Sequence, residues 1–287
     1  MAQTNEIKQH ISAVEQTRKI TNAMKLVSSA RMGKARKNAF YNAEHFKRIR
    51  SSMKDIISSP HTFENEFLTL RPDGHRIYII VGSDKGMAGS YNSDLLKFAL
   101  GELSRHKNAV VVTVGMLAAD FMKKNGFPPE EEIAGMTVPP KLTKARYLTS
   151  VAMESYRSGQ IHSVHIVYTS FGQDSAPKPE AKRLLPILES DYDDITPGKY
   201  YDRVEYFPSA GEVFNNIVPQ YLTSIFFDIL SQSYAAEQFY RMNAMQSATE
   251  NADELLIKLN REYNMARQSA ITQEITEISS AAELLKR

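Results

Sequence analysis

QYLTSIFFDILSQSYAAEQFYRMNAMQSATENADELLIKLNREYNMARQSAITQEITEISSAAELLKR, residues 220–287, contains neither proline nor glycine. Residues 1–59 contain no proline and a single glycine, Gly33, so nearly all helix breakers lie between the two ends. Ordinary globular helices run about 8–20 residues, and longer patterns without breakers indicate coiled coils. Both ends are therefore predicted to be long helices that flank a compact middle.

Apolar and small residues recur at steps of three and four in both ends, which is the spacing of one helix face. At the start they are Ile7, Ile11, Val14, Thr17, Ile20, Met24 and Val27. At the end they are Met245, Ala248, Ala252, Leu256, Leu259, Tyr263, Ala266 and Ala270. We expect the two stripes to pack as an antiparallel, left-handed pair, with residues near Met24 beside residues near Met265.

Charge supports this pairing. Residues 18–54 hold eleven Lys or Arg and one acid, whereas residues 209–287 hold six bases and ten acids. The basic run alone has three interpretations: a solvated helix face, a surface for an acidic protein, or a nucleic-acid site.

The base of the last helix carries two adjacent apolar rows at spacing four. One row is Val213, Ile217, Tyr221, Ile225 and Ile229, and the other is Phe214, Val218, Leu222, Phe226 and Leu230. Two rows make a wide apolar face, so this part of the helix is predicted to pack against the middle domain.

The middle alternates strand-like and helix-like segments, which is typical of a parallel α/β sheet. RIYIIV, AVVVTVG and SVHIVYTS are the strand-like runs, and AKRLLPIL is a candidate further strand. We predict three parts: an N-terminal coiled-coil helix over 1–60, a central Rossmann-like α/β domain with a mainly parallel sheet over 61–208, and a C-terminal coiled-coil helix over 209–287.

Composition excludes several kinds of chemistry. The chain of 287 residues has no cysteine, so disulfides, thiolate zinc sites and thiol nucleophiles are ruled out. No stretch approaches the roughly 20 apolar residues that a membrane-spanning helix requires. The seven histidines show no ligand spacing. We expect no catalytic residue, no metal and no cofactor.

The glycine-rich stretch VGSDKGMAGSYN, residues 81–92, follows a strand-like run and precedes a helix-like one. Such turns often hold phosphates, but this one has neither the GxxxxGK[ST] nor the GxGxxG spacing. We therefore expect a protein-contact loop that binds no phosphate.

Three stretches carry a resemblance. TRKITNAMKLVSSARM near the start, SDKGMAGSYN in the middle and the C-terminal segment that ends in ITQEITEISSAAELL resemble the gamma subunit of the F-type ATP synthase. Together they cover about a third of the chain, in the order found in that family.

The resemblance implies a non-catalytic central-stalk rotor that couples ion flow through a membrane c-ring to ATP synthesis or hydrolysis. Its implied partners are the alpha and beta subunits of the catalytic hexamer, the epsilon subunit and the c-ring. The implied location is the cytoplasmic face of a bacterial cell membrane, which the chain touches only through the c-ring.

The resemblance also implies roles for individual residues. Those implied to contact the catalytic ring are Met24, Lys85, Ala88, Arg241, Arg267, Gln268, Thr272, Glu274 and Glu277. Tyr206 and Phe207 match the foot near the c-ring and the epsilon subunit. By spacing alone, each is an ordinary helix or loop residue.

Two other classes of protein fit parts of the sequence. A nucleotide-dependent enzyme would require a phosphate-binding glycine loop, and a nucleic-acid-binding coiled coil would explain the basic run. Neither explains ITQEITEI, and no nucleic-acid partner is expected.

Overall fold

The computed structural model describes residues 2–60, 63–72, 74–106, 108–135, 139–172, 175–199, 202 and 204–284. The chain divides into two compact units. We call residues 1–28 with 241–287 the helix-pair unit, and residues 29–240 the α/β unit. Two long helices, α1 (Ala2–Ile57) and α5 (Ala210–Leu284), contribute residues to both units. Long helices at both ends were predicted, and they are confirmed.

The α/β unit is built on a five-stranded sheet of order β3-β2-β1-β4-β5. Ile79 of β1 pairs with Val112 of β2 and with Ile166 of β4, both in parallel register, and only β5 runs antiparallel. The mainly parallel sheet is therefore confirmed. Its strands are β1 (His75–Val81), β2 (Ala109–Val114), β3 (Glu131–Ile133), β4 (Ile161–Ser170) and β5 (Lys178–Leu185). The sequence pattern suggested β5 but not the three-residue β3, which is too short to show a period.

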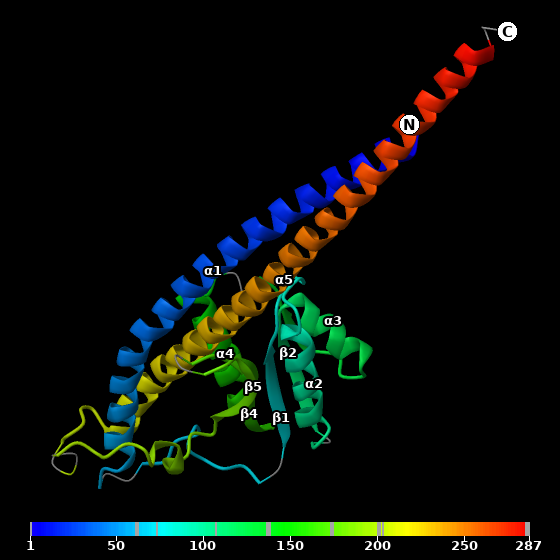
Figure 1. The fold of residues 1–287 in the computed structure, drawn as a ribbon. Coiled ribbons are helices and arrows are strands. Elements are labelled where there is room, and N and C mark those ends of the chain that lie inside the picture. The colour runs from blue at the N-terminus through cyan, green and yellow to red at the C-terminus, as the bar shows by residue number, and fades with distance from the viewer. Residues whose placement is uncertain are drawn as a thin grey trace. The chain divides into compact units, whose positions relative to one another are not determined.

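Helices cover both faces of the sheet (Figure 1). Helices α2 (Tyr91–Leu103) and α3 (Met116–Lys124) pack on one face, where Tyr78 and Ile80 point. Helix α4 (Leu142–Arg157) packs on the other, with the nearby parts of α1 and α5. A short 3-10 helix, η1 (Glu189–Tyr192), follows β5.

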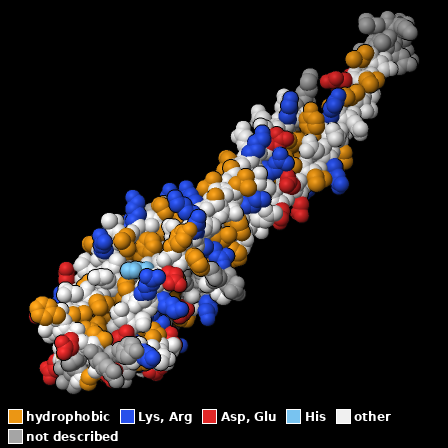
Figure 2. All heavy atoms as spheres, turned by 90° about the vertical axis from the view of Figure 1, so that its left-hand side faces the viewer, with side chains coloured by type: hydrophobic (Ala, Val, Ile, Leu, Met, Phe, Trp, Pro, Cys, Tyr) orange, Lys and Arg blue, Asp and Glu red, His pale blue; other side chains and the backbone are white. Residues whose placement is uncertain are grey.

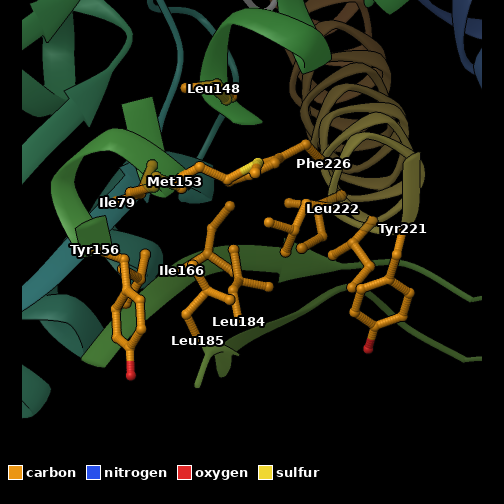
Figure 3. Packing of buried hydrophobic residues seen from close by; sticks show 14 of the residues in the cluster. Ile79, Leu148, Met153, Tyr156, Ile166, Leu184, Leu185, Tyr221, Leu222 and Phe226 are labelled. Carbon is orange, nitrogen blue, oxygen red and sulfur yellow. The ribbon is translucent and has the colours of Figure 1, made fainter. Parts of the chain in front are cut away.

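The larger core lies between the sheet, α4 and the base of α5. Figure 3 shows Leu222 and Phe226 of α5 among Met153 of α4, Ile166 of β4 and Leu184 of β5. Both predicted rows of α5 belong to this core, which confirms that the base of the helix packs on the domain. Within the α/β unit, α5 is thus held by ordinary apolar burial.

The helix-pair unit consists of the start of α1 beside the later part of α5 (Figure 1). Arg18 Nη1 donates to Asp253 Oδ1 at 3.0 Å, the hydroxyls of Thr21 and Thr249 lie 2.8 Å apart, and Lys25 Nζ donates to Gln246 Oε1 at 2.9 Å. Partner numbers fall on α5 as they rise on α1. The predicted antiparallel pairing is confirmed.

The predicted register is wrong. Because Lys25 reaches Gln246, Met24 lies near that level of α5. Met265 is nineteen residues further along, about 28 Å at 1.5 Å per residue. Sequence periodicity does not fix how far one helix is displaced along the other.

The buried seam of α1 also differs from the predicted stripe. It runs through Ile7, Ile11, Val14, Arg18, Thr21 and Lys25, at alternating steps of four and three. Ile20 and Val27, assigned to the stripe from their apolar character, are 59% and 47% exposed. The predicted steps average less than the 3.5 residues of a heptad, so that stripe rotates away from α5 after Val14. The α5 stripe is buried or half-buried at every position.

Candidate functional site

The glycine loop, residues 82–90, lies at the carboxyl end of β1, where open α/β sheets usually bind ligands. Its polar groups are engaged within the chain. The backbone N–H of Ser83 donates to Asn92 Oδ1 at 3.2 Å, and that of Tyr91 donates to the Ala88 carbonyl at 3.1 Å. These two donors are therefore used inside the chain, and the expectation that the loop binds no phosphate stays a prediction.

Close packing explains one of the nearby glycines. Gly115, which follows β2, has φ +100°, and a Cβ there would lie 2.8 Å from the carbonyl group of Gly82. A side chain would be strained as well as obstructed at this position. The turn therefore needs glycine because two backbone segments approach closely there.

The two predicted contact residues of the loop have different surroundings. Lys85 is exposed, whereas Ala88 is 3% exposed. Ala88 belongs to a buried cluster with Tyr91 of α2, Phe171 at the end of β4 and Tyr234 of α5. These aromatic side chains fill space at the carboxyl end of the sheet, which is where open α/β sheets usually bind ligands.

Met87 was missed by sequence reasoning. It is 62% exposed and has φ 61°, a conformation that residues other than glycine seldom adopt. A hydrophobic side chain between Gly86 and Ala88 was the available signal. Lys85, Met87 and Ser90 are the exposed side chains of this loop.

The predicted residues of the helix-pair unit form two groups. Met24 is half-buried and Arg241 is 8% exposed, so both are packed within the chain. The other group is exposed along the last turns of α5: Arg267, Gln268, Thr272, Glu274 and Glu277. Their side chains are accessible, and their roles stay predictions.

An exposed isoleucine stripe accompanies this second group. Ile271, Ile275 and Ile278 are 44%, 62% and 70% exposed. Spacings of four and three place them on one helix face, and that face lies away from the seam that continues from Leu259 through Ala266. Exposed apolar groups gathered on one face indicate a protein-contact surface. The spacing of the three isoleucines is visible in the sequence, but the sequence alone does not show that their face differs from the buried seam.

The predicted foot residues lie in the loop before α5. Phe207 is 92% exposed, and Tyr206 is half-buried. Burial raises the pKa of the Tyr206 phenol, and the nearby Asp55 carboxylate adds to the shift. Phe207 is an unusually exposed aromatic side chain.

Two findings concern membranes and metals. Within the described parts of the chain, none of the helices combines the length and apolarity needed to cross a bilayer. Those parts also contain no group of three or more metal-ligating side chains.

Comparison with known proteins identifies the family. The family described as ATP synthase matches residues 3–285. The ATP synthase gamma chain of Clostridium pasteurianum is 37% identical over 281 residues, and that of Ruminiclostridium cellulolyticum is 33% identical over 288; each alignment covers 98% of both chains. Acetobacterium woodii has a relative, 32% identical over 297 residues, that is named a sodium-ion-specific gamma chain. The chain belongs to the ATP synthase gamma chain family.

Solved structures agree on the fold. A chain of the Euglena gracilis mitochondrial ATP synthase matches with a TM-score of 0.70 and 16% identity, covering 99% of this chain and 95% of that one. A chain from the central stalk and c-ring structure of the Tetrahymena thermophila enzyme matches with a TM-score of 0.58 and 21% identity.

Proposed function

We propose that this chain is the central-stalk subunit that turns inside an ATP synthase and couples ion flow to the synthesis or hydrolysis of ATP. Its membership in the gamma chain family over nearly its whole length is the observation that carries the proposal. In this role the chain catalyses nothing itself. It transmits rotation to catalytic sites on other subunits.

The helix-pair unit suits a shaft. Its two helical segments, within residues 1–28 and 241–287, lack proline and glycine, and their seam combines apolar burial with hydrogen bonds across the pair. Burial of Val14 with Ala252, Leu256 and Leu259 supplies the non-directional attraction. The hydrogen bonds oppose sliding of one helix along the other.

The exposed end of α5 suits a surface that turns inside a ring of subunits. We propose that the isoleucine stripe and the neighbouring polar group from Arg267 to Glu277 contact the alpha and beta subunits. Lys85, Met24 and Arg241 are proposed to meet the same ring. Ala88 would contribute through the backbone shape of its loop, because its side chain is buried.

The foot and the location follow from the same role. We propose that Tyr206 and Phe207 lie near the epsilon subunit and the c-ring. The chain would then sit at the cytoplasmic face of a bacterial cell membrane and depend on the c-ring for its attachment. Its exposed aromatic side chain, Phe207, would be covered in that assembly.

Co-expression with the alpha and beta subunits of the same source tests the proposal. The chain should co-purify with a hexamer that hydrolyses ATP, and a bead on the α/β unit should rotate when ATP is added. A chain that stays alone, or a complex in which the bead never turns, would contradict the rotor role.

A nucleic-acid-binding coiled coil was the alternative, and the family comparisons give it no support. On the face that Figure 2 presents, Lys and Arg are spread among hydrophobic and other side chains without forming one continuous patch. Duplex binding with a steep salt dependence would revive the alternative, because each phosphate contact adds to that slope.

A further inference from the structure

Asp228, on α5, is a carboxylate inside the α/β unit that the rotor role does not use. It makes no ion pair with any residue that the structure describes. Among the described residues its hydrogen bond comes from Gln232 Nε2, which donates to Asp228 Oδ2 at 2.7 Å. The side chain is half-buried; burial raises the pKa of its carboxyl, and the charge of Lys182 lowers it in part. A partly buried acid outside any described ion pair is a candidate functional site.

A cavity of about 390 Å³ leads to this carboxylate. Its walls are mostly apolar or aromatic, and Phe40 stands 58% exposed among them. The apolar part of the lining consists of Ala39, Phe40, Ala43, Phe171 and Ala235. A volume of this size, with apolar walls and few polar groups, is typical of small-molecule sites.

The polar end of the cavity is fixed in place. Gln232 Oε1 accepts hydrogen bonds from the Phe171 backbone N–H at 3.1 Å and from Ser170 Oγ at 3.2 Å, so its amide can turn only one way toward Asp228. Ser231, which also lines the cavity, is fully buried, and its hydroxyl has no hydrogen-bond partner among the described residues. The lining of the cavity therefore includes a carboxylate and a hydroxyl, on residues three apart along α5.

Arg36 is a cation that lines this cavity, and it is already engaged. Its guanidinium lies 4.9 Å from the centre of the Phe171 ring, and Nη2 donates to the Gly172 carbonyl at 3.2 Å. Arg36 and Asp228 both line the cavity, and the Arg36 charge is held against Phe171 and Gly172.

We propose that this cavity binds a small organic cation, a primary ammonium on a short aromatic or alkyl body. The ammonium would pair with Asp228 and donate to the Ser231 hydroxyl, and the body would lie between Phe40, Ala39 and Ala235. Aromatic walls favour a cation further through their π faces.

Phenethylammonium is a suitable probe, with neutral phenethyl alcohol as its matched control. Calorimetry on the full chain should detect saturable binding of the amine and at least about tenfold weaker binding of the alcohol, since a hydrogen-bonded charge is worth about 1.5–3 kcal/mol. Equal affinity for the two compounds would overturn the proposal, because the carboxylate would then play no part. Binding of neither compound would overturn it as well.

Variants separate the site from general charge effects. Asp228→Asn should weaken amine binding about tenfold or more, whereas Asp120→Asn, which removes the same charge on α3 outside the cavity, should leave it unchanged. Ala39→Leu keeps the carboxylate but fills the space, and it should also abolish binding. Amine binding that survives both Asp228→Asn and Ala39→Leu in chains with unchanged melting curves would refute the site.

Discussion

Ala88 and Met87 are neighbours in the glycine loop, yet they differ sharply in accessibility. Ala88 is 3% exposed and Met87 is 62% exposed. The sequence could place the loop after a strand, but it could not say which side chain turns inward. That choice depends on the cluster formed with Phe171 and Tyr234, which are distant in sequence.

A thiol at each position should report this difference. Because the chain has no cysteine, Met87→Cys and Ala88→Cys each create a single thiol. We expect Met87→Cys to react with a maleimide at least about tenfold faster in the isolated folded chain, and the two rates to converge in denaturant. Equal rates in the folded chain would mean that Ala88 is accessible and that the loop packs otherwise.

Asp228 predicts a pH dependence of stability. Burial raises its pKa above the ordinary carboxyl value, although the Gln232 hydrogen bond and Lys182 lower it in part. Asp228 lines a second cavity besides the one described above. The other charged groups that line these two cavities are Arg36, Lys47 and Arg50 on α1 and Asp194 after η1. An acid with a raised folded-state pKa contributes stability below its unfolded pKa, and this stability is lost as pH rises through the folded pKa.

Asp228→Asn should therefore raise the melting temperature at neutral pH by about 2 °C or more. Its amide oxygen can still accept from Gln232, so the hydrogen bond is kept. The advantage should shrink as pH falls toward 3.8, the ordinary value. Asp120→Asn is the control, and a gain that stays constant between neutral and acid pH would contradict the explanation.

At the scale of elements, hydrophobic patterning predicted the helices and strands better than it predicted their contacts. RIYIIV lies in β1, and its consecutive side chains point alternately into two apolar layers on opposite faces of the sheet. The seam of α1 was harder, because Thr21 and Lys25 occupy seam positions while the apolar Ile20 is exposed. Polar pairs across two helices can be recognised only when the partner, here Thr249 or Gln246, is known.

Paired cysteines test this register. Thr21→Cys with Thr249→Cys should form a disulfide readily, because the hydroxyls they replace lie 2.8 Å apart. Met24→Cys with Met265→Cys should stay reduced under the same mild oxidant, since a disulfide tolerates Cα separations of no more than about 7 Å. Mobility shifts on non-reducing gels distinguish the two. Rapid oxidation of the second pair would restore the register expected from the sequence.

At the scale of the molecule, the two ends of α5 should differ in what they contribute to folding. Phe226 is fully buried in the core of the α/β unit, whereas Ser279 is exposed. We expect Phe226→Asp to cost more than the about 3–5 kcal/mol lost when a buried Phe becomes Ala, because it also buries an unpaired carboxylate. Ser279→Asp should change stability by less than about 0.5 kcal/mol. Thermal melts check both, and equal losses would contradict the assignment of a packed base.

The molecule as a whole was more predictable than its contact surfaces. Breaker-free ends and an alternating middle determine the architecture through local physics alone. The exposure of Met87, the isoleucine stripe and the Asp228 cavity depend on which faces remain uncovered after tertiary packing. A local sequence pattern does not predict which faces those are. The contact roles of Arg267, Glu274 and the residues between them stay predictions for the same reason, since they concern other chains.

The hydrogen-bonded seam of the helix-pair unit makes its alignment discrete. A slip of one heptad would bring the Thr21 hydroxyl opposite Leu256 or Met242 in place of Thr249, and the hydrogen bond between the two helices at this position would be lost. Polar pairs at such positions specify register in coiled coils. Under a twisting load, the helix pair should deform elastically over small displacements and should not shift to another register. A chain with an all-leucine seam would lack these polar pairs. Even if it were more stable at rest, its helices would slip in register as the shaft turns, and the angle that the shaft transmits would drift.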